Sequence, residues 1–229
     1  MADDGPALWE SLTAEKRAAL SKVEAPRINL TALISALRRP FSGSLLITRF
    51  FFGLAFSIFQ TIFSLYALRR FGLDAQQTGF VLTYVGVLSV IVQGGVVGKL
   101  SERFRDDVLI FISVGLMAVS LLGWGFAPSV VVLLIIMVPI AFSGGVLNTI
   151  ISSALTKTVQ PQEIGGILGL STSIESLTRV LAPTIGGVLL DQLGSWSPGV
   201  FSAIILACLF VYVWSAIYNH PLAISSTPG

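Results

Sequence analysis

Six apolar runs, each roughly 20 residues or longer, follow one another along most of the chain. They cover residues 44–68, 77–98, 108–127, 130–153, 165–190 and 199–218. An α-helix needs about 20 apolar residues to cross the hydrocarbon core of a bilayer. Charged residues make up only 11% of the sequence, against about 25% in ordinary soluble domains, which excludes a soluble globular protein. The sequence therefore predicts an all-α membrane protein with six transmembrane helices.

The apolar runs divide the chain into three predicted parts. Residues 1–43 are expected to form a polar cytoplasmic segment, residues 44–218 the six-helix bundle, and residues 219–229 a cytoplasmic tail. In the first part, Leu30, Leu33, Ile34 and Leu37 recur at helical spacing, which predicts a short helix. This helix either lies on the membrane surface or is a connector that touches the ends of the spans.

Basic residues are concentrated in the loops on one side of the predicted bundle. The N-terminal segment and the loops after the second and fourth spans carry most of them, whereas the opposite loops carry only Arg69 and Arg70. Cytoplasmic loops are enriched in Lys and Arg. We therefore expect a multi-pass protein of the plasma membrane (in bacteria, the inner membrane) with both termini in the cytoplasm.

Polar side chains are unevenly divided among the predicted spans. The first, second, fourth and fifth spans carry most of them, and the third and sixth carry few. A polar group in hydrocarbon must find a partner or water. We therefore expect the four polar spans to face an interior or a cavity, and the third and sixth spans to be peripheral and lipid-facing.

Glu175 and Arg179 are charged residues in the fifth span, four positions apart. This spacing places them on one helix face, where they can pair. The pair either binds an ionic substrate or takes part in proton coupling, or it is structural and fixes the fifth span to its neighbours. Arg49, near the cytoplasmic end of the first span, is expected to have a structural role. Three neutral residues are candidates as cavity-lining donors or as helix–helix hydrogen bonds: Gln60, Tyr84 and Asn148.

Two further patterns concern how the spans pack. The pairs Gly94/Gly98 and Gly165/Gly169 have the small-xxx-small spacing that is typical of close helix packing. The second span ends in GGVVGKLSERF and the fifth in GGVLLDQLGSW. These similar endings, three spans apart, predict two three-helix repeats, which is a common architecture in secondary transporters.

The loop after the second span resembles the loop signature of the major facilitator superfamily. Gly98 matches the glycine of that signature, Glu102 the acid and Arg103 the base. The resemblance implies that Gly98 lets two helices approach closely and that the charges pair across helix ends in one conformation. Arg105 stands where the family has glycine, and acids follow it where bases are usual. The alternative is a solvated loop that only sets topology.

A wider resemblance covers about residues 8–218. The stretch from Arg49 to Gly95 is similar to helices seven and eight of the drug-antiporter branch, which includes tetracycline-efflux-like members. The stretch from Gly144 to Gly194 is similar to helices ten and eleven, where Arg179 and Pro183 match the family and Ala182 replaces a glycine. The resemblance implies the C-terminal six-helix half of a major-facilitator fold.

The sequence offers no enzyme constellation, and we expect neither an enzyme nor a cofactor, a metal site or a nucleic-acid partner. Its one histidine, His220, follows the last span, and it has one cysteine, so neither a Ser-His protease nor a zinc cluster is available. A phosphate-binding glycine loop with its Lys and Ser/Thr is missing from the sequence.

Two functions remain as hypotheses. In the first, the chain is a half-transporter that moves a small molecule by alternating access together with a second six-helix half, on another chain or another copy of itself. In the second, it is a structural accessory subunit of a larger respiratory or photosynthetic membrane complex. In both, the polar spans need a partner as well as the lipid bilayer.

Overall fold

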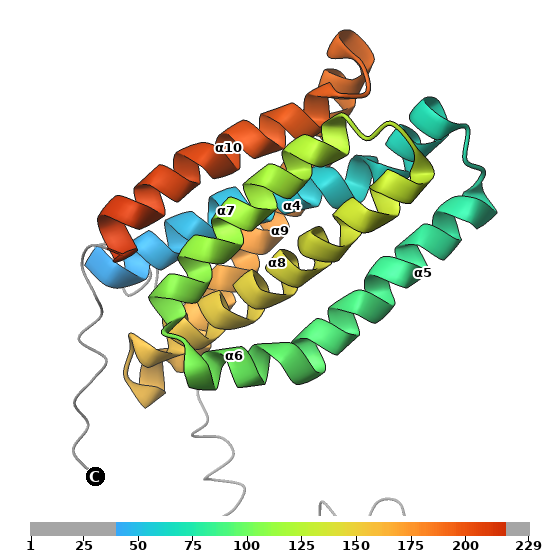
Figure 1. The fold of residues 1–229 in the computed structure, drawn as a ribbon. Coiled ribbons are helices and arrows are strands. Elements are labelled where there is room, and N and C mark those ends of the chain that lie inside the picture. Colours follow the sequence, from blue (N-terminus) through green and yellow to red (C-terminus); the bar gives the residue numbers. More distant parts are fainter. Residues whose placement is uncertain (1–39, 219–229) are drawn as a thin grey trace, which may run out of the picture.

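The computed structural model describes residues 40–218, and within them the fold is entirely helical (Figure 1). The α-helices are α4 (Pro40–Phe71), α5 (Ala75–Ile91), α6 (Val97–Arg103), α7 (Asp106–Gly125), α8 (Val130–Lys157), α9 (Ile164–Leu193) and α10 (Ser197–Val213). Two π-helices, η1 (Val92–Val96) and η3 (Trp214–Tyr218), and the short 3₁₀ turn η2 (Pro161–Glu163) complete the elements. The predicted surface helix between Leu30 and Leu37 and the tail 219–229 lie outside the described residues.

The predicted spans correspond to long helices of the structure. Within residues 40–218, five segments are long and apolar enough to cross a membrane: Ser42–Phe71, Ala75–Arg103, Asp106–Gly125, Val130–Lys157 and Ser197–Ala216. The second of these includes α5, η1 and α6 as one continuous span. The remaining predicted span corresponds to α9, which has 30 residues. It is not among the five because Glu175, Arg179 and several hydroxyl side chains lower its hydropathy.

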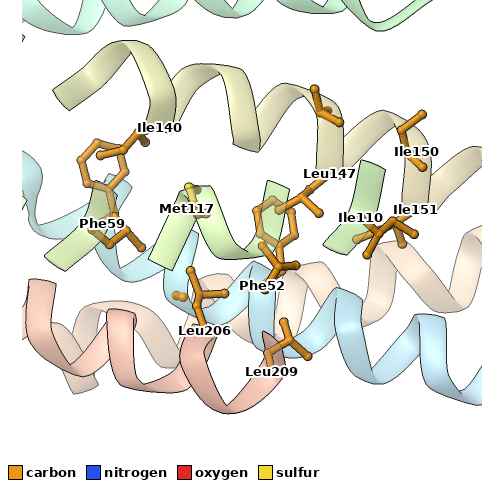
Figure 2. Packing of buried hydrophobic residues seen from close by; sticks show 14 of the residues in the cluster. Phe52, Phe59, Ile110, Met117, Ile140, Leu147, Ile150, Ile151, Leu206 and Leu209 are labelled. Atoms are coloured by element: carbon orange, nitrogen blue, oxygen red, sulfur yellow. The ribbon is translucent and has the colours of Figure 1, made fainter. Parts of the chain in front are cut away.

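The apolar core lies between α4, α7, α8 and α10. Figure 2 shows Phe52 and Phe59 of α4 close to Met117 of α7, Leu147 of α8 and Leu206 of α10, all members of one buried cluster. A membrane bundle is held by close packing more than by polarity, so an apolar helix can be central.

The third span was predicted to be peripheral and lipid-facing, and α7 has one buried face and one exposed apolar face that carries Ile112 and Val119. Half of the apolar window of α7 is buried, against 17% in the second span. The helix packs against both α8 and α10, and its Trp124 is fully buried. The buried face of α7 packs apolar residues against apolar neighbours. For the sixth span, α10, a third of the window is buried.

Helix contacts follow the predicted internal repeat. If α4, α5 and α7 correspond to α8, α9 and α10, each major contact has a counterpart. Thus α4 packs on α9 as α8 packs on α5, and α4 packs on α10 as α8 packs on α7. The α4–α9 contact and its counterpart, the α5–α8 contact, differ in extent. Helices α4 and α9 are closely packed, whereas α5 lies loosely beside α8 at the edge of the bundle (Figure 1). The contact pattern is that of two three-helix repeats.

The close helix approaches use other glycines than the predicted pairs. A Cβ atom on Gly94, Gly98, Gly165 or Gly169 would have nothing within 4 Å. A Cβ on Gly199 of α10 would instead lie 2.7 Å from Gly125 Cα of α7, and one on Gly186 of α9 would overlap Ile62 of α4. The prediction for the four glycines is wrong for contacts within the described residues, since the spacing identifies a small-residue face but not what the face meets.

Replacing Gly186 by alanine is expected to destabilise the bundle by about 1–3 kcal/mol, because Ile62 must leave its position in a packed contact. The adjacent Gly187 is a matched control, since a Cβ there meets nothing within 4 Å and alanine favours the helix by up to about 1 kcal/mol. Thermal unfolding of the two purified variants in one detergent measures the difference. Equal unfolding temperatures for Gly186→Ala and Gly187→Ala would contradict the α4–α9 contact.

Candidate functional site

Arg49 of α4 connects three helices. Its side chain is 7% exposed. Its Nη1 donates to Asn148 Oδ1 of α8 at 2.5 Å, and its Nη2 donates to Glu175 Oε2 of α9 at 2.8 Å. A buried guanidinium needs acceptors for its N–H groups, because a lone charge in a membrane protein is costly. Arg49 of α4 therefore links α8 and α9.

Glu175 accepts from two guanidinium groups. Its second oxygen, Oε1, accepts from Arg179 Nη2 at 2.7 Å, so the sequence correctly predicted this pairing. The exposed fraction rises along the chain of charges, from 7% for Arg49 to 30% for Glu175 and 66% for Arg179. The network therefore extends from the buried interior to an accessible surface.

The close approach of α4 and α9 brings Arg49 within reach of Glu175. A Cβ on Gly53 would lie 3.3 Å from Thr178 Oγ1, so the bare glycine backbone of α4 accommodates the α9 side chain. Thr178 Oγ1 donates to the Glu175 carbonyl oxygen at 2.7 Å. At the other end of the same helix pair, Arg69 pairs with Asp191 at 2.7 Å. Two ion pairs thus hold α4 and α9 together.

A cavity of about 250 Å³ lies beside this network. Four spans form its wall: α4, the α5–η1 segment, α8 and α9. The lining residues are Arg49, Phe52, Gly53, Phe56, Ser57, Gln60, Ser89, Gln93, Gly144, Gly145, Asn148, Glu175 and Arg179. The expectation that the first, second, fourth and fifth spans share a cavity is therefore confirmed, and none of the lining residues comes from α7 or α10.

The structure brings together four of the five predicted site residues. Gln60, Asn148, Glu175 and Arg179 line the cavity, whereas Tyr84 lies exposed on α5 and is not part of its wall. Ser89 and Gln93 take its place. These two residues are four apart and share a helix face, and this spacing was the signal that could have identified them. Gln93 lies in the π-helix η1, a type of turn often found at functional sites.

The three loop motif residues all lie on α6 (Val97–Arg103). Gly98, Glu102 and Arg103 are exposed, and the close approach implied for Gly98 is not present in residues 40–218. The ion pairs seen at this end join Lys157 to Asp106 at 2.7 Å and Arg105 to Asp107 at 2.8 Å. The first of them links the end of α8 to the start of α7, so residues outside the matched signature connect the helix ends here.

Removing the charge of Glu175 is expected to destabilise the protein by at least about 2 kcal/mol. Breaking a buried ion pair costs roughly 3–5 kcal/mol, and the 30% exposure of Glu175 reduces that penalty. Thermal unfolding of Glu175→Gln measures the loss. The double variant Arg49→Met with Glu175→Gln is expected to be more stable than Glu175→Gln alone, since no unpaired buried charge remains. An unchanged unfolding temperature in Glu175→Gln would contradict this assignment.

Comparisons with known proteins agree with this architecture. Residues 12–227 match the family model described as Major Facilitator Superfamily. Solute carrier family 22 member 18 of Mus musculus is 38% identical over 142 residues, covering 62% of this chain and 35% of that protein. Tetracycline resistance protein, class H, of Pasteurella multocida is 27% identical over 193 residues, covering 80% of this chain and 46% of that protein.

A solved structure has the same fold. The crystal structure of the human organic anion transporter MFSD10 (TETRAN) superposes with a TM-score of 0.68 at 18% identity, over 74% of this chain and 40% of that one. The chain thus spans between about a third and a half of the length of these proteins. The family match covers nearly the whole chain and the helices form a multi-pass membrane bundle. The chain therefore belongs to the Major Facilitator Superfamily of membrane transporters.

Proposed function

We propose that residues 40–218 form the C-terminal six-helix half of a transporter of the drug-antiporter branch. It would move a small molecule across the plasma membrane by alternating access, together with a second six-helix half. The observation that carries this proposal is the polar cavity that four spans build around Arg49, Glu175 and Arg179. The similarity to a tetracycline resistance protein over 80% of the chain supports the choice of branch.

The charged residues of the cavity favour transport over a purely structural role. Ionisable residues inside membrane bundles are costly and usually mark substrate or ion pathways. Arg49 and Asn148 alone would serve as a helix–helix link. Arg179 adds a second guanidinium that is 66% exposed and lines the cavity, and a helix–helix link does not require it.

The cavity needs a second wall. Gln60, Gln93 and Arg179 lie on its accessible side, and side chains of this kind do not face hydrocarbon. A second six-helix half, either in the same polypeptide or in another, would cover them and enclose the cavity. The length of the relatives, of which this chain matches less than half, supports a second half as the partner.

The proposed orientation places both termini and the turn after α6 in the cytoplasm. It is tested in a Cys208→Ser background, since Cys208 is the single cysteine of the sequence. We expect an impermeant maleimide to label Gln76→Cys in intact cells, and to label Ser101→Cys only after permeabilisation. Both positions are exposed on the protein, so a difference in labelling between them reports the side of the membrane and not burial. The reverse labelling pattern would contradict the proposed orientation. The Cys208→Ser protein without an added cysteine is the control and should not be labelled.

Transport is tested with the full protein reconstituted in vesicles with an imposed proton gradient. We expect protein-dependent movement of tetracycline or another small amphipathic compound that a proton ionophore abolishes. Extraction in mild detergent, native electrophoresis and mass spectrometry identify what accompanies the chain. A second six-helix half supports the proposal. Co-migration with a large respiratory or photosynthetic complex, without flux of any compound, would favour the accessory subunit instead.

A further inference from the structure

We propose that Arg179 is the binding point for the negative group of an aromatic organic monoanion, such as a sulfonate or a carboxylate, held in the cavity between α4, η1, α8 and α9. This inference rests on the proposed function, because it names the substrate class of the same cavity. Two observations support it. The charged residues of the lining do not balance, and the guanidinium of Arg49 is buried and hydrogen-bonded whereas that of Arg179 is largely exposed.

The part of the cavity wall that these four spans form has an excess of positive charge. Arg49, Glu175 and Arg179 are the charged residues among those that line it. Two cations and one carboxylate leave a net charge of one positive unit. A site with low-dielectric walls concentrates the field of such a charge, so the empty space beside the network favours a single negative charge.

Arg49 is not available to a ligand. Its two terminal nitrogens donate to Asn148 and Glu175, and its side chain is almost fully buried. Among the described lining residues, the unbalanced charge is therefore accessible at Arg179. Within the described residues, the guanidinium of Arg179 donates from Nη2 to Glu175 Oε1, and a guanidinium has five N–H groups.

The geometry of a guanidinium suits an oxyanion. Its N–H groups lie in one plane and match a carboxylate or sulfonate with two parallel hydrogen bonds. Arg179 is anchored on one side by Glu175 and is 66% exposed on the other. Glu175 therefore orients the guanidinium, and its remaining edge can receive the ligand's oxygen atoms.

Helix α4 contributes aromatic side chains to the same lining. Phe52 and Phe56 are stacked with ring centroids 5.7 Å apart and an interplanar angle of 18°, and both line the cavity. Aromatic pairs in offset or edge-to-face geometry contribute beyond their buried area. A ligand with one ring and one anionic group would find an aromatic partner in Phe56 and a cationic partner in Arg179, since both line the cavity.

A cationic ligand has no comparable partner in the described wall. Both oxygens of Glu175 already accept from guanidinium groups. A cation placed near Glu175 would also lie near Arg179, and like charges at short range repel. The cavity as built from these four spans therefore selects against positive charge.

Two matched probes test this inference on the full protein purified in detergent. Benzenesulfonate and trimethylphenylammonium have the same number of heavy atoms and carry permanent charges of opposite sign. We expect saturable equilibrium binding of radiolabelled benzenesulfonate and none of trimethylphenylammonium. Arg179→Gln should weaken benzenesulfonate binding at least about tenfold, as loss of hydrogen bonds to a charged group implies. Arg179→Lys should retain part of the affinity, because it keeps the charge without the planar fork.

Arg70→Gln is the matched control. It removes an exposed arginine at the end of α4 that is not part of the cavity lining. Binding of benzenesulfonate should therefore be unchanged in this variant. Size-exclusion elution checks that each variant is folded, and if Arg179→Gln is not, an undiminished affinity in Arg179→Lys overturns the proposal. Equal binding of the cation, undiminished binding in Arg179→Gln, or no saturable binding of benzenesulfonate would also overturn it.

Vesicle flux separates this inference from the proposed function. Binding of benzenesulfonate that requires Arg179, without any flux in vesicles, would support the anion site and contradict transport. Flux of cationic compounds without binding of benzenesulfonate would support transport and contradict the anion site.

Discussion

The desolvation of one arginine organises the functional half of this structure. Arg49 lies at a position where its guanidinium is buried, and a buried charge is tolerated only with partners. Those partners come from α8 and α9, so the three helices must converge at one depth. The cavity lies beside this convergence, and its charged wall is composed of Arg49, its partner Glu175 and Arg179, which continues the network.

Sequence reasoning identified what is encoded locally. The six spans follow from apolar runs, the Glu175–Arg179 contact follows from four-residue spacing, and the four cavity helices follow from their polar content. It missed what depends on distant partners. Arg49 meets Glu175 across a separation of 126 residues, and no periodicity shows such a contact. The burial of α7 and the glycines in close contact depend on which face meets which helix, and the pattern of small or apolar residues does not contain that information.

The internal repeat is used asymmetrically. The α4–α9 pair is held by ion pairs at two levels, Arg49–Glu175 and Arg69–Asp191. Its counterpart, α5 with α8, has a π-turn where Gln93 reaches the cavity and a span that is only 17% buried. One side of the cavity therefore belongs to a helix pair joined by ion pairs, whereas the other belongs to a span that is largely exposed within the described residues.

The distance in sequence between Arg49 and its partners also has a consequence for biosynthesis. A ribosome adding about 5–20 residues per second needs roughly 6–25 seconds to proceed from Arg49 to Glu175, 126 residues later. During that interval α4 has emerged with its guanidinium unmatched. A position near the helix end lets the long side chain reach the lipid headgroups. The Arg49 side chain of the nascent α4 can therefore remain hydrated at the membrane interface. It enters the bundle once Glu175 has been synthesised and can pair with it.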